Sequence, residues 1–162
     1  MMFEPDKDDT RALREAFSRF VTGVTVVTCP SEFGSVAMTA NSFSSISLEP
    51  PLVMWAAARA SRRYPAFAAA RYYAIHVLAA EQREIAELFA QNGFGLAEID
   101  HELNDRNVPL IPGCLARFEC RQTALHDGGD HTIIMGEVER ATMRNGNALA
   151  FFGARLMRLQ SE

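Results

Sequence analysis

The 162-residue sequence predicts a mainly β, antiparallel fold with short helices, built as a barrel or a sandwich. Short β-branched or apolar runs follow one another with links of hairpin length, which is typical of antiparallel sheets. Two long alternating runs, Leu115–Leu125 and His131–Met143, are separated by a turn rich in glycine and aspartate. No G-x-G-x-x-G motif follows a strand, so a Rossmann dinucleotide site is not expected.

Length and composition indicate a single domain over residues 1–162 with a sizeable core. Hydrophobic residues make up 48% of the chain, which argues against extensive disorder, and the net charge of -4 argues against a nucleic-acid-binding module. Residues 1–10 are acidic, lack a signal-peptide pattern and predict a disordered arm. No apolar run reaches the roughly 18 residues of a membrane-spanning helix, so we expect a cytoplasmic protein.

The first third of the chain predicts one helix and then a series of strands. An apolar repeat of helical spacing follows Thr10, a suitable N-cap, and Gly23 is expected to end this helix. Pro30–Gly34 predicts a hairpin turn between two strands. The continuously apolar run Leu52–Ala58 predicts a strand buried on both faces. The other strands expected here are Val24–Cys29, Ser35–Ala40 and the serine-rich stretch before Pro50.

The middle of the chain predicts two helices around another strand. Ser61 is a suitable N-cap for a short alanine-rich helix that has Pro65 in its first turn. Tyr72–Ala79 predicts the strand. Residues 81–91 carry an amphipathic helical repeat.

Two features follow in the second half. Residues 92–112 show no regular pattern, and so long a segment in a compact domain predicts a lid or a dimer arm. The dipeptide Asn145-Gly146 predicts a tight hairpin into a final strand at Ala148–Phe152.

A stretch of polar residues at Met38–Pro51 is the most distinctive part of the sequence. Ser45 and Ser47 are two residues apart, so on a strand their hydroxyls share one face and the intervening apolar side chains face the other way. Uncharged hydroxyls both donate and accept hydrogen bonds. Such a row suits a flat, polar, heteroaromatic ligand, and the same composition is also common in solvated surface turns.

Three arginines, Arg59, Arg62 and Arg63, surround the expected helix start at Ser61. Helix N-termini favour anions, and guanidinium groups bind phosphate through paired hydrogen bonds. The pattern therefore suits a phosphate site, and it equally suits a solvated helix start.

The histidines differ in their sequence surroundings. His76 lies within an apolar strand run and is interpreted as structural. His126 and His131 flank an acidic turn that contains Asp127 and Asp130. Imidazole and carboxylate both ligate metals, but the spacing matches no zinc signature, and we expect no metal site.

Three segments, Phe20–Thr28, Met38–Pro51 and Gly129–Ile133, together resemble the flavin reductase-like family. The resemblance runs from about Ala16 to Arg155. It implies a split β-barrel of the FMN-binding type with short flanking helices, assembled as a homodimer. It also implies an NAD(P)H:flavin oxidoreductase, which uses NADH or NADPH to reduce FMN or FAD and supplies the reduced flavin to a separate monooxygenase.

The resemblance implies two groups of flavin-binding residues. The first would line the isoalloxazine ring and consists of Met38, Thr39, Ala40 and Asn41, with Ser44 and Ser45 nearby. The second would contact the ribityl-phosphate end and consists of Ala57, Ser61 and Arg62. Phe94, in the irregular segment, would cover a bound ring.

His131 of the Gly-Asp-His motif would be the catalytic-site residue, which positions the nicotinamide or hydrogen-bonds the flavin. The C-terminal run Phe151–Leu156 departs from the family's arginine-glycine-arginine-tyrosine-like pattern and keeps only Arg155. This departure leaves a non-catalytic flavoprotein open, one that keeps FMN as a sensor, store or electron carrier. A split barrel that binds haem through a histidine is a further alternative.

Overall fold

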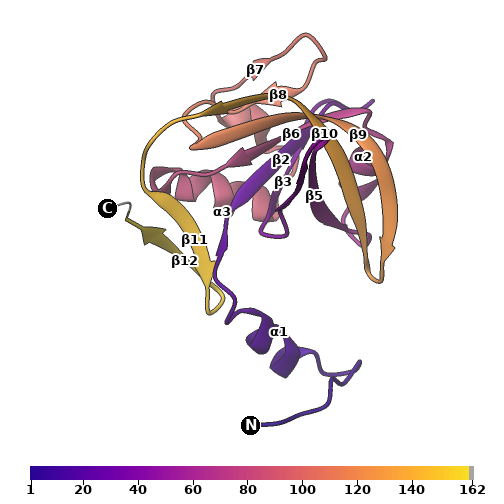
Figure 1. The fold of residues 1–162 in the computed structure, drawn as a ribbon, viewed down its shortest axis with the longest axis vertical. Helices are drawn as coiled ribbons and strands as arrows, with labels where there is room; N and C mark the ends of the chain where they lie inside the picture. The colour runs from indigo at the N-terminus through magenta and orange to yellow at the C-terminus, as the bar shows by residue number, and fades with distance from the viewer. Residues whose placement is uncertain (161–162) are drawn as a thin grey trace.

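The computed structural model describes residues 1–160, and a seven-stranded antiparallel sheet dominates it (Figure 1). Its strands are β2 (Thr25–Cys29), β3 (Val36–Ala40), β4 (Ser44–Leu48), β5 (Pro51–Ala58), β6 (Tyr72–Val77), β9 (Ala116–Gly128) and β10 (His131–Met143). They are ordered β3-β2-β6-β9-β10-β5-β4, and β3 also contacts β5, so the sheet curls back on itself. The predicted mainly antiparallel β-fold is confirmed.

A second sheet contains β1 (Thr22–Gly23), β11 (Ala148–Phe152) and β12 (Arg155–Leu159), in the order β1-β11-β12. The hairpin predicted at Asn145-Gly146 is wrong, because β11 pairs with β1 and β12 and not with β10. The pairing of β10 with β5 covers residues 131–137 and its pairing with β9 continues to Met143, after which the chain leaves the main sheet and β11 pairs with β1.

The α-helices of residues 1–160 are α1 (Arg11–Phe17), α2 (Tyr64–Ala69) and α3 (Arg83–Gln91), and η1 (Ala80–Gln82) and η2 (Gly95–Glu98) are 3-10 turns. The first helix ends earlier than the stop predicted at Gly23, because Thr22–Gly23 forms β1. Ser61 does not cap α2, which begins three residues later; its hydroxyl instead accepts a hydrogen bond from the Arg63 N–H at 3.2 Å. The amphipathic helix predicted at residues 81–91 is confirmed by α3.

Two apolar cores lie on opposite sides of β2 and β3. One is centred on Trp55, whose indole makes an edge-to-face contact with Phe67 at 5.0 Å between ring centroids. The other packs α3 and β11 against the sheet through Phe89 and Leu149. Because side chains alternate along a strand, successive residues of β3 contribute to one core and then the other.

Strands β5 and β4 differ from expectation. Val53, Trp55 and Ala57 are buried, whereas the residues between them are half-buried, so β5 is not buried equally on both faces. In β4 a bulge lies between Ser45 and Ser47 and interrupts the simple alternation that would place both hydroxyls on one face.

The segment predicted as a lid or dimer arm is folded against the sheet over its second half. It carries η2 and a small hairpin of β7 (Glu102–Leu103) and β8 (Pro109–Leu110). Val108, Leu110 and Ile111 are buried. The Arg140 guanidinium pairs with Asp105 at 2.7 Å, and Asn104 donates to Glu119 at 2.8 Å.

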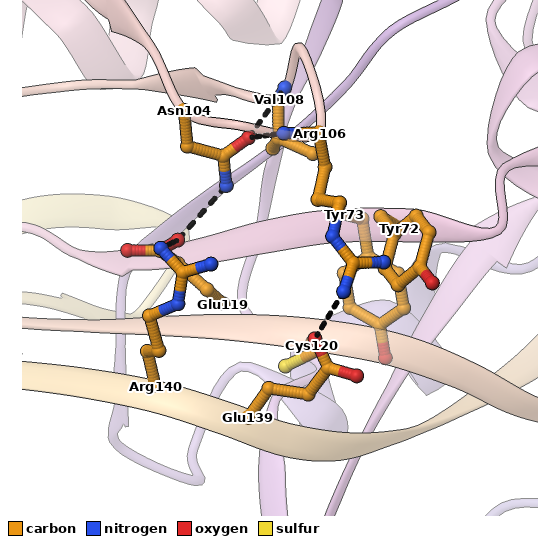
Figure 2. A pocket seen from close by; sticks show the side chains of 9 residues that line it. All are labelled: Tyr72, Tyr73, Asn104, Arg106, Val108, Glu119, Cys120, Glu139 and Arg140. Carbon is orange, nitrogen blue, oxygen red and sulfur yellow. Dashed lines mark hydrogen bonds and ion pairs between the residues drawn. The ribbon is translucent and has the colours of Figure 1, made fainter.

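Figure 2 shows how this hairpin encloses a small cavity beside Tyr73 and Cys120. The Arg106 guanidinium lies 4.0 Å from the Tyr72 ring centroid and pairs with Glu139. The cavity is about 10 Å³, which is room for about one water molecule. None of the predicted site residues lines it, so this cavity is part of the scaffold.

His76 anchors the same segment from inside the protein. Its Nδ1–H donates to the Val26 carbonyl at 2.9 Å, and its Nε2 accepts from the Ile111 N–H at 3.1 Å. Both ring nitrogens are therefore occupied in the neutral form. The structural role predicted for His76 is confirmed.

We expect His76 to make stability depend on pH. Burial lowers the pKa of His76 from 6.5 to about 4. Because the folded-state pKa lies below the unfolded one, its stabilising contribution is complete above pH 6.5 and is lost as the pH falls towards 4. This group should lower the free energy of unfolding by about 2 kcal/mol between about pH 7 and about pH 5.

Chemical denaturation of the wild type and His76→Gln at both pH values measures this contribution. The wild type should lose more stability than the variant on acidification. Equal losses would show that His76 does not carry the effect.

Candidate functional site

The carboxyl end of β5 and the start of β10 lie side by side and place His131 at the surface. His131 is opposite Ala58 in the strand register, and the Arg59 N–H donates to the Asp130 carbonyl at 3.0 Å. The His131 side chain is 43% exposed. Ala57 is completely buried, so its methyl group belongs to the core.

Asp130 fixes the orientation of the His131 ring. The two side chains are joined by a hydrogen bond of 2.7 Å between His131 Nδ1 and Asp130 Oδ1. This bond holds the pKa of the Asp130 carboxyl below its usual value. Since a carboxylate only accepts, the proton lies on Nδ1, and Nε2 is left to interact with a ligand.

Thr132 connects this strand end to α2. Its hydroxyl is buried, accepts from Arg59 Nε at 3.0 Å and lies 2.7 Å from the Tyr64 hydroxyl. Arg59 also pairs with Asp127 at 2.6 Å. The sequence did not single out Thr132 or Tyr64, because their partners are distant in the chain.

The three arginines have three different roles. Arg59 is engaged by Asp127 and Thr132. The Arg63 guanidinium is half-buried and donates to the carbonyls of Ala37 at 3.0 Å and Phe89 at 2.5 Å, and burial lowers its pKa. Arg62 is exposed and has no hydrogen bond or ion pair within residues 1–160. Of the three, only Arg62 is therefore free to bind an anion.

Part of the hydroxyl-rich stretch is used by the protein itself. The Thr39 hydroxyl donates to the Ala86 carbonyl at 2.6 Å, and Ser42 both donates to and accepts from the backbone of Ala56. Asn41 and Ser45 are exposed. The groups that remain for a ligand thus include the Asn41 amide and the edge-strand hydroxyls of Ser45 and Ser47.

Two open clefts border β3, and each contains only a few of the predicted residues. Thr39, Ala40 and Asn41 line the first, about 290 Å³, together with α3 and the β11–β12 hairpin. Arg62 and Phe94 line the second, about 540 Å³. Neither cleft includes the remaining predicted residues, which are Met38 in the core, Ser44 and Ser45 on β4, Ala57, Ser61, His131, and Arg155 at the start of β12.

This donor set fits a flavin. A flavin offers carbonyls and ring nitrogens on a flat apolar body and a single anionic end. Asn41 and apolar side chains line the first cleft, and Arg62, which has no ion pair within the described residues, lines the second. Neutral hydrogen-bonding groups suit the ring, and the guanidinium suits the phosphate.

Residues 1–160 give less support to a metal site, to a nucleophilic cysteine or to a membrane-spanning helix. The described residues contain no group of three or more histidine, cysteine or acidic side chains that could hold a metal ion. Burial raises the pKa of Cys29 and Cys120 to about 12 and of Cys114 to about 11, so their thiols are protonated at neutral pH and are weak nucleophiles. None of the described helices is long and apolar enough to cross a membrane.

Comparison with known proteins identifies relatives over nearly the whole chain. A family model described as "Flavin reductase like domain" matches residues 17–160. The FMN reductase (NADH) SmoA of Agrobacterium fabrum is 52% identical over 152 residues, which cover 94% of this chain and 87% of that protein.

Of two other matches, one is with a longer protein and the other names FAD. The reductase component of the flavin-dependent trigonelline monooxygenase of Acinetobacter baylyi is 39% identical over 88% of this chain, and the matched part spans 46% of that protein's length. The solved structure of the NADH:FAD oxidoreductase SgcE6 of Streptomyces globisporus, in complex with NAD and FAD fragments, is 37% identical with a TM-score of 0.90 and covers 98% of each chain.

Proposed function

This chain belongs to the flavin reductase-like domain family, and on that basis we propose that it is an NADH-dependent flavin reductase that supplies reduced flavin to a separate monooxygenase. The split-barrel fold expected from the sequence is confirmed by structures of flavin reductases. The observation that carries the proposal is the exposed His131, whose ring is oriented by Asp130. His131 is opposite Ala58 in the strand register, and Ala58 lies four residues before the unpaired Arg62 in the chain.

The proposed flavin contacts come from four places along the chain. Arg62 would hold the phosphate because it is the unpaired member of the arginine group. Thr39, Ala40 and Asn41 would contact the ring, because they line the cleft at the end of β3. The other proposed contacts are Ser44, Ser45, Ser61, Phe94 and Arg155. The side chains of Met38 and Ala57 are buried in the core, so these two residues would contribute backbone groups only.

The residues of the chain position and protect the reactants. When bound, the flavin supplies a ring that accepts a hydride from NADH. His131 presents Nε2 in a fixed orientation and can hydrogen-bond the nicotinamide amide or the flavin. Because hydride transfer depends on alignment more than on a strong acid or base, a positioned imidazole is sufficient.

The relatives favour reductase activity over the non-catalytic flavoprotein that the altered C-terminal run suggested, since SmoA is named an FMN reductase (NADH). Haem binding is also disfavoured. His76 uses both ring nitrogens for backbone hydrogen bonds and cannot ligate iron without breaking one of them.

We further propose that the chain forms a homodimer. Helix α1 has no buried residue and stands away from the seven-stranded sheet in Figure 1. Phe17 and Phe20 are 69% and 76% exposed, and a second copy would cover these rings. Three expectations from the sequence stay predictions. They are a single domain over residues 1–162, a disordered arm at residues 1–10 and a cytoplasmic location.

Anaerobic mixing of the protein with NADH and a molar excess of FMN or FAD tests the function. The account predicts that all of the added flavin is bleached and that reduced flavin passes an ultrafiltration membrane that retains the protein. Bleaching of only one flavin per protein, with none in the filtrate, would indicate a resident cofactor and contradict a supply role.

A further inference from the structure

Arg59 contacts the β9–β10 hairpin at three points around His131. Its backbone N–H donates to the Asp130 carbonyl at 3.0 Å, its Nε donates to the Thr132 hydroxyl at 3.0 Å, and its terminal nitrogen pairs with Asp127 at 2.6 Å. These three partners lie in the turn, at the start of β10 and at the end of β9. One residue of the β5–α2 loop therefore holds together the parts of the hairpin that surround His131.

The turn of this hairpin has few contacts of its own. It consists of Gly129 and Asp130, and Gly129 has a φ of +74°, in the left-handed region that favours glycine. The Asp130 side chain is 95% exposed, so it orients the His131 ring but does not attach the turn to the rest of the protein. The backbone pairing of His131 with Ala58 and the three contacts of Arg59 supply that attachment.

Thr132 connects these contacts to the apolar core. Neighbouring residues of a strand face opposite sides, and accordingly Thr132 is 4% exposed where the His131 side chain is 43% exposed. The Thr132 hydroxyl lies 2.7 Å from the Tyr64 hydroxyl, and Tyr64 packs against the core centred on Trp55. The position of His131 is thus fixed from the opposite face of its own strand.

Arg59 is not placed to bind a ligand itself. It lines neither of the two clefts that border β3, and its guanidinium is used by Asp127 and Thr132. The Asp127 side chain is 81% exposed, and an ion pair so open to water contributes little to stability. Removal of Arg59 should therefore affect the position of the hairpin more than the stability of the fold.

We propose that Arg59 is a positioning residue for hydride transfer, which acts through the hairpin on His131. It holds the imidazole in a fixed place relative to the start of α2, where Arg62 is proposed to bind the flavin phosphate. A misplacement of about 1 Å can lower the rate of an aligned reaction about 100-fold. This inference rests on the proposed function, because a reductase must align the nicotinamide with the flavin.

Arg59→Ala should lower kcat about tenfold and leave FMN affinity within about threefold of wild type. The phosphate end keeps its own backbone hydrogen bonds, from the Ser61 N–H to the Ala58 carbonyl at 3.1 Å and from the Tyr64 N–H to the Ser61 carbonyl at 3.0 Å. Arg59→Lys should recover part of the rate, because an ammonium keeps the charge but lacks the fixed pair of donors. Flavin reduction at saturating NADH and flavin titration measure the two quantities.

Three further variants separate positioning from a general loss of structure. In a His131→Ala background, Arg59→Ala should lower kcat by less than about twofold, because the residue through which it acts is gone. Asp127→Ala truncates an exposed side chain, so the fold should persist while kcat falls about threefold. Arg140→Ala is the matched control, because it removes an ion pair of 2.7 Å with Asp105 near the other end of β10 and should keep the wild-type rate. Equal losses from Arg59→Ala in both backgrounds would overturn the proposal.

The NMR resonance of the His131 ring Cε1–H, assigned by its absence from His131→Ala, gives a readout that needs no turnover. Arg59→Ala and Asp127→Ala should shift or broaden this resonance, and Arg140→Ala should not. An unchanged resonance together with a wild-type rate in Arg59→Ala would contradict the positioning role. A shifted resonance in a protein that oxidises no NADH would support the contact between Arg59 and the hairpin and refute only the proposed function.

Discussion

Replacing His131 by alanine is expected to lower kcat/KM for NADH about 100-fold, while flavin affinity changes by less than about threefold. The ring is 43% exposed and is oriented by Asp130 at 2.7 Å, so its Nε2 is presented to a ligand at the surface. Loss of a positioned hydrogen bond disturbs the alignment that hydride transfer requires. Steady-state NADH oxidation and flavin titration measure the two quantities separately.

A matched control is available on the neighbouring strand. His126 is exposed and opposite Ile133 in the β9–β10 register, so His126→Ala should retain wild-type kinetics. Asp130→Asn should show an intermediate loss, because an amide holds the ring without favouring the same tautomer. Wild-type turnover in His131→Ala would show that the histidine only forms the turn.

Replacing Arg62 by alanine should weaken flavin binding between about 10- and 100-fold, because hydrogen bonds to a charged phosphate are among the stronger ones. Turnover at saturating flavin should be largely retained, since the contact proposed for Arg62 is with the phosphate and not with the reacting ring. Arg62→Lys should recover part of the affinity, because it keeps the charge but loses the paired geometry. Flavin titration of the variants measures the effect.

Arg63, next to Arg62 in the chain, provides a variant that should affect stability where Arg62→Ala does not. Arg63→Ala should lower thermal stability, because its guanidinium bonds the Ala37 and Phe89 carbonyls, and Arg62→Ala should not. Arg71→Ala, an exposed arginine whose ring contact is with Tyr72, serves as the charge control for affinity. Equal flavin affinity in Arg62→Ala and wild type would remove the phosphate role.

The fold is predictable where local signals decide it. The β9–β10 hairpin follows from alternation over both strands and a glycine-containing turn, and α3 follows from its apolar repeat. The Asn145-Gly146 hairpin fails because β11 pairs with β1, a strand near the other end of the chain, and with β12, and the first of these partners is a non-local choice. The end of α1 is missed for the same reason, since β1 pairs with a strand near the other end of the chain.

The sequence predicts which residue types belong to the site, but it does not predict which of them are used in hydrogen bonds within the protein and which are left for a ligand. Arg59, Arg62 and Arg63 have the same chemistry, and only folding shows that two of them are engaged within the protein. The hydroxyls of Thr39 and Ser42 are likewise satisfied by the distant backbones of Ala86 and Ala56. The sequence gives no local sign of these long-range hydrogen bonds.

NADH oxidation by the purified protein, with and without added FMN or FAD, tests the central claim most directly. The account predicts slow oxidation of NADH by the protein alone and a rate that rises with added flavin until it saturates. Oxidation that does not respond to added flavin, or no oxidation by protein that binds flavin, would contradict a reductase that supplies reduced flavin.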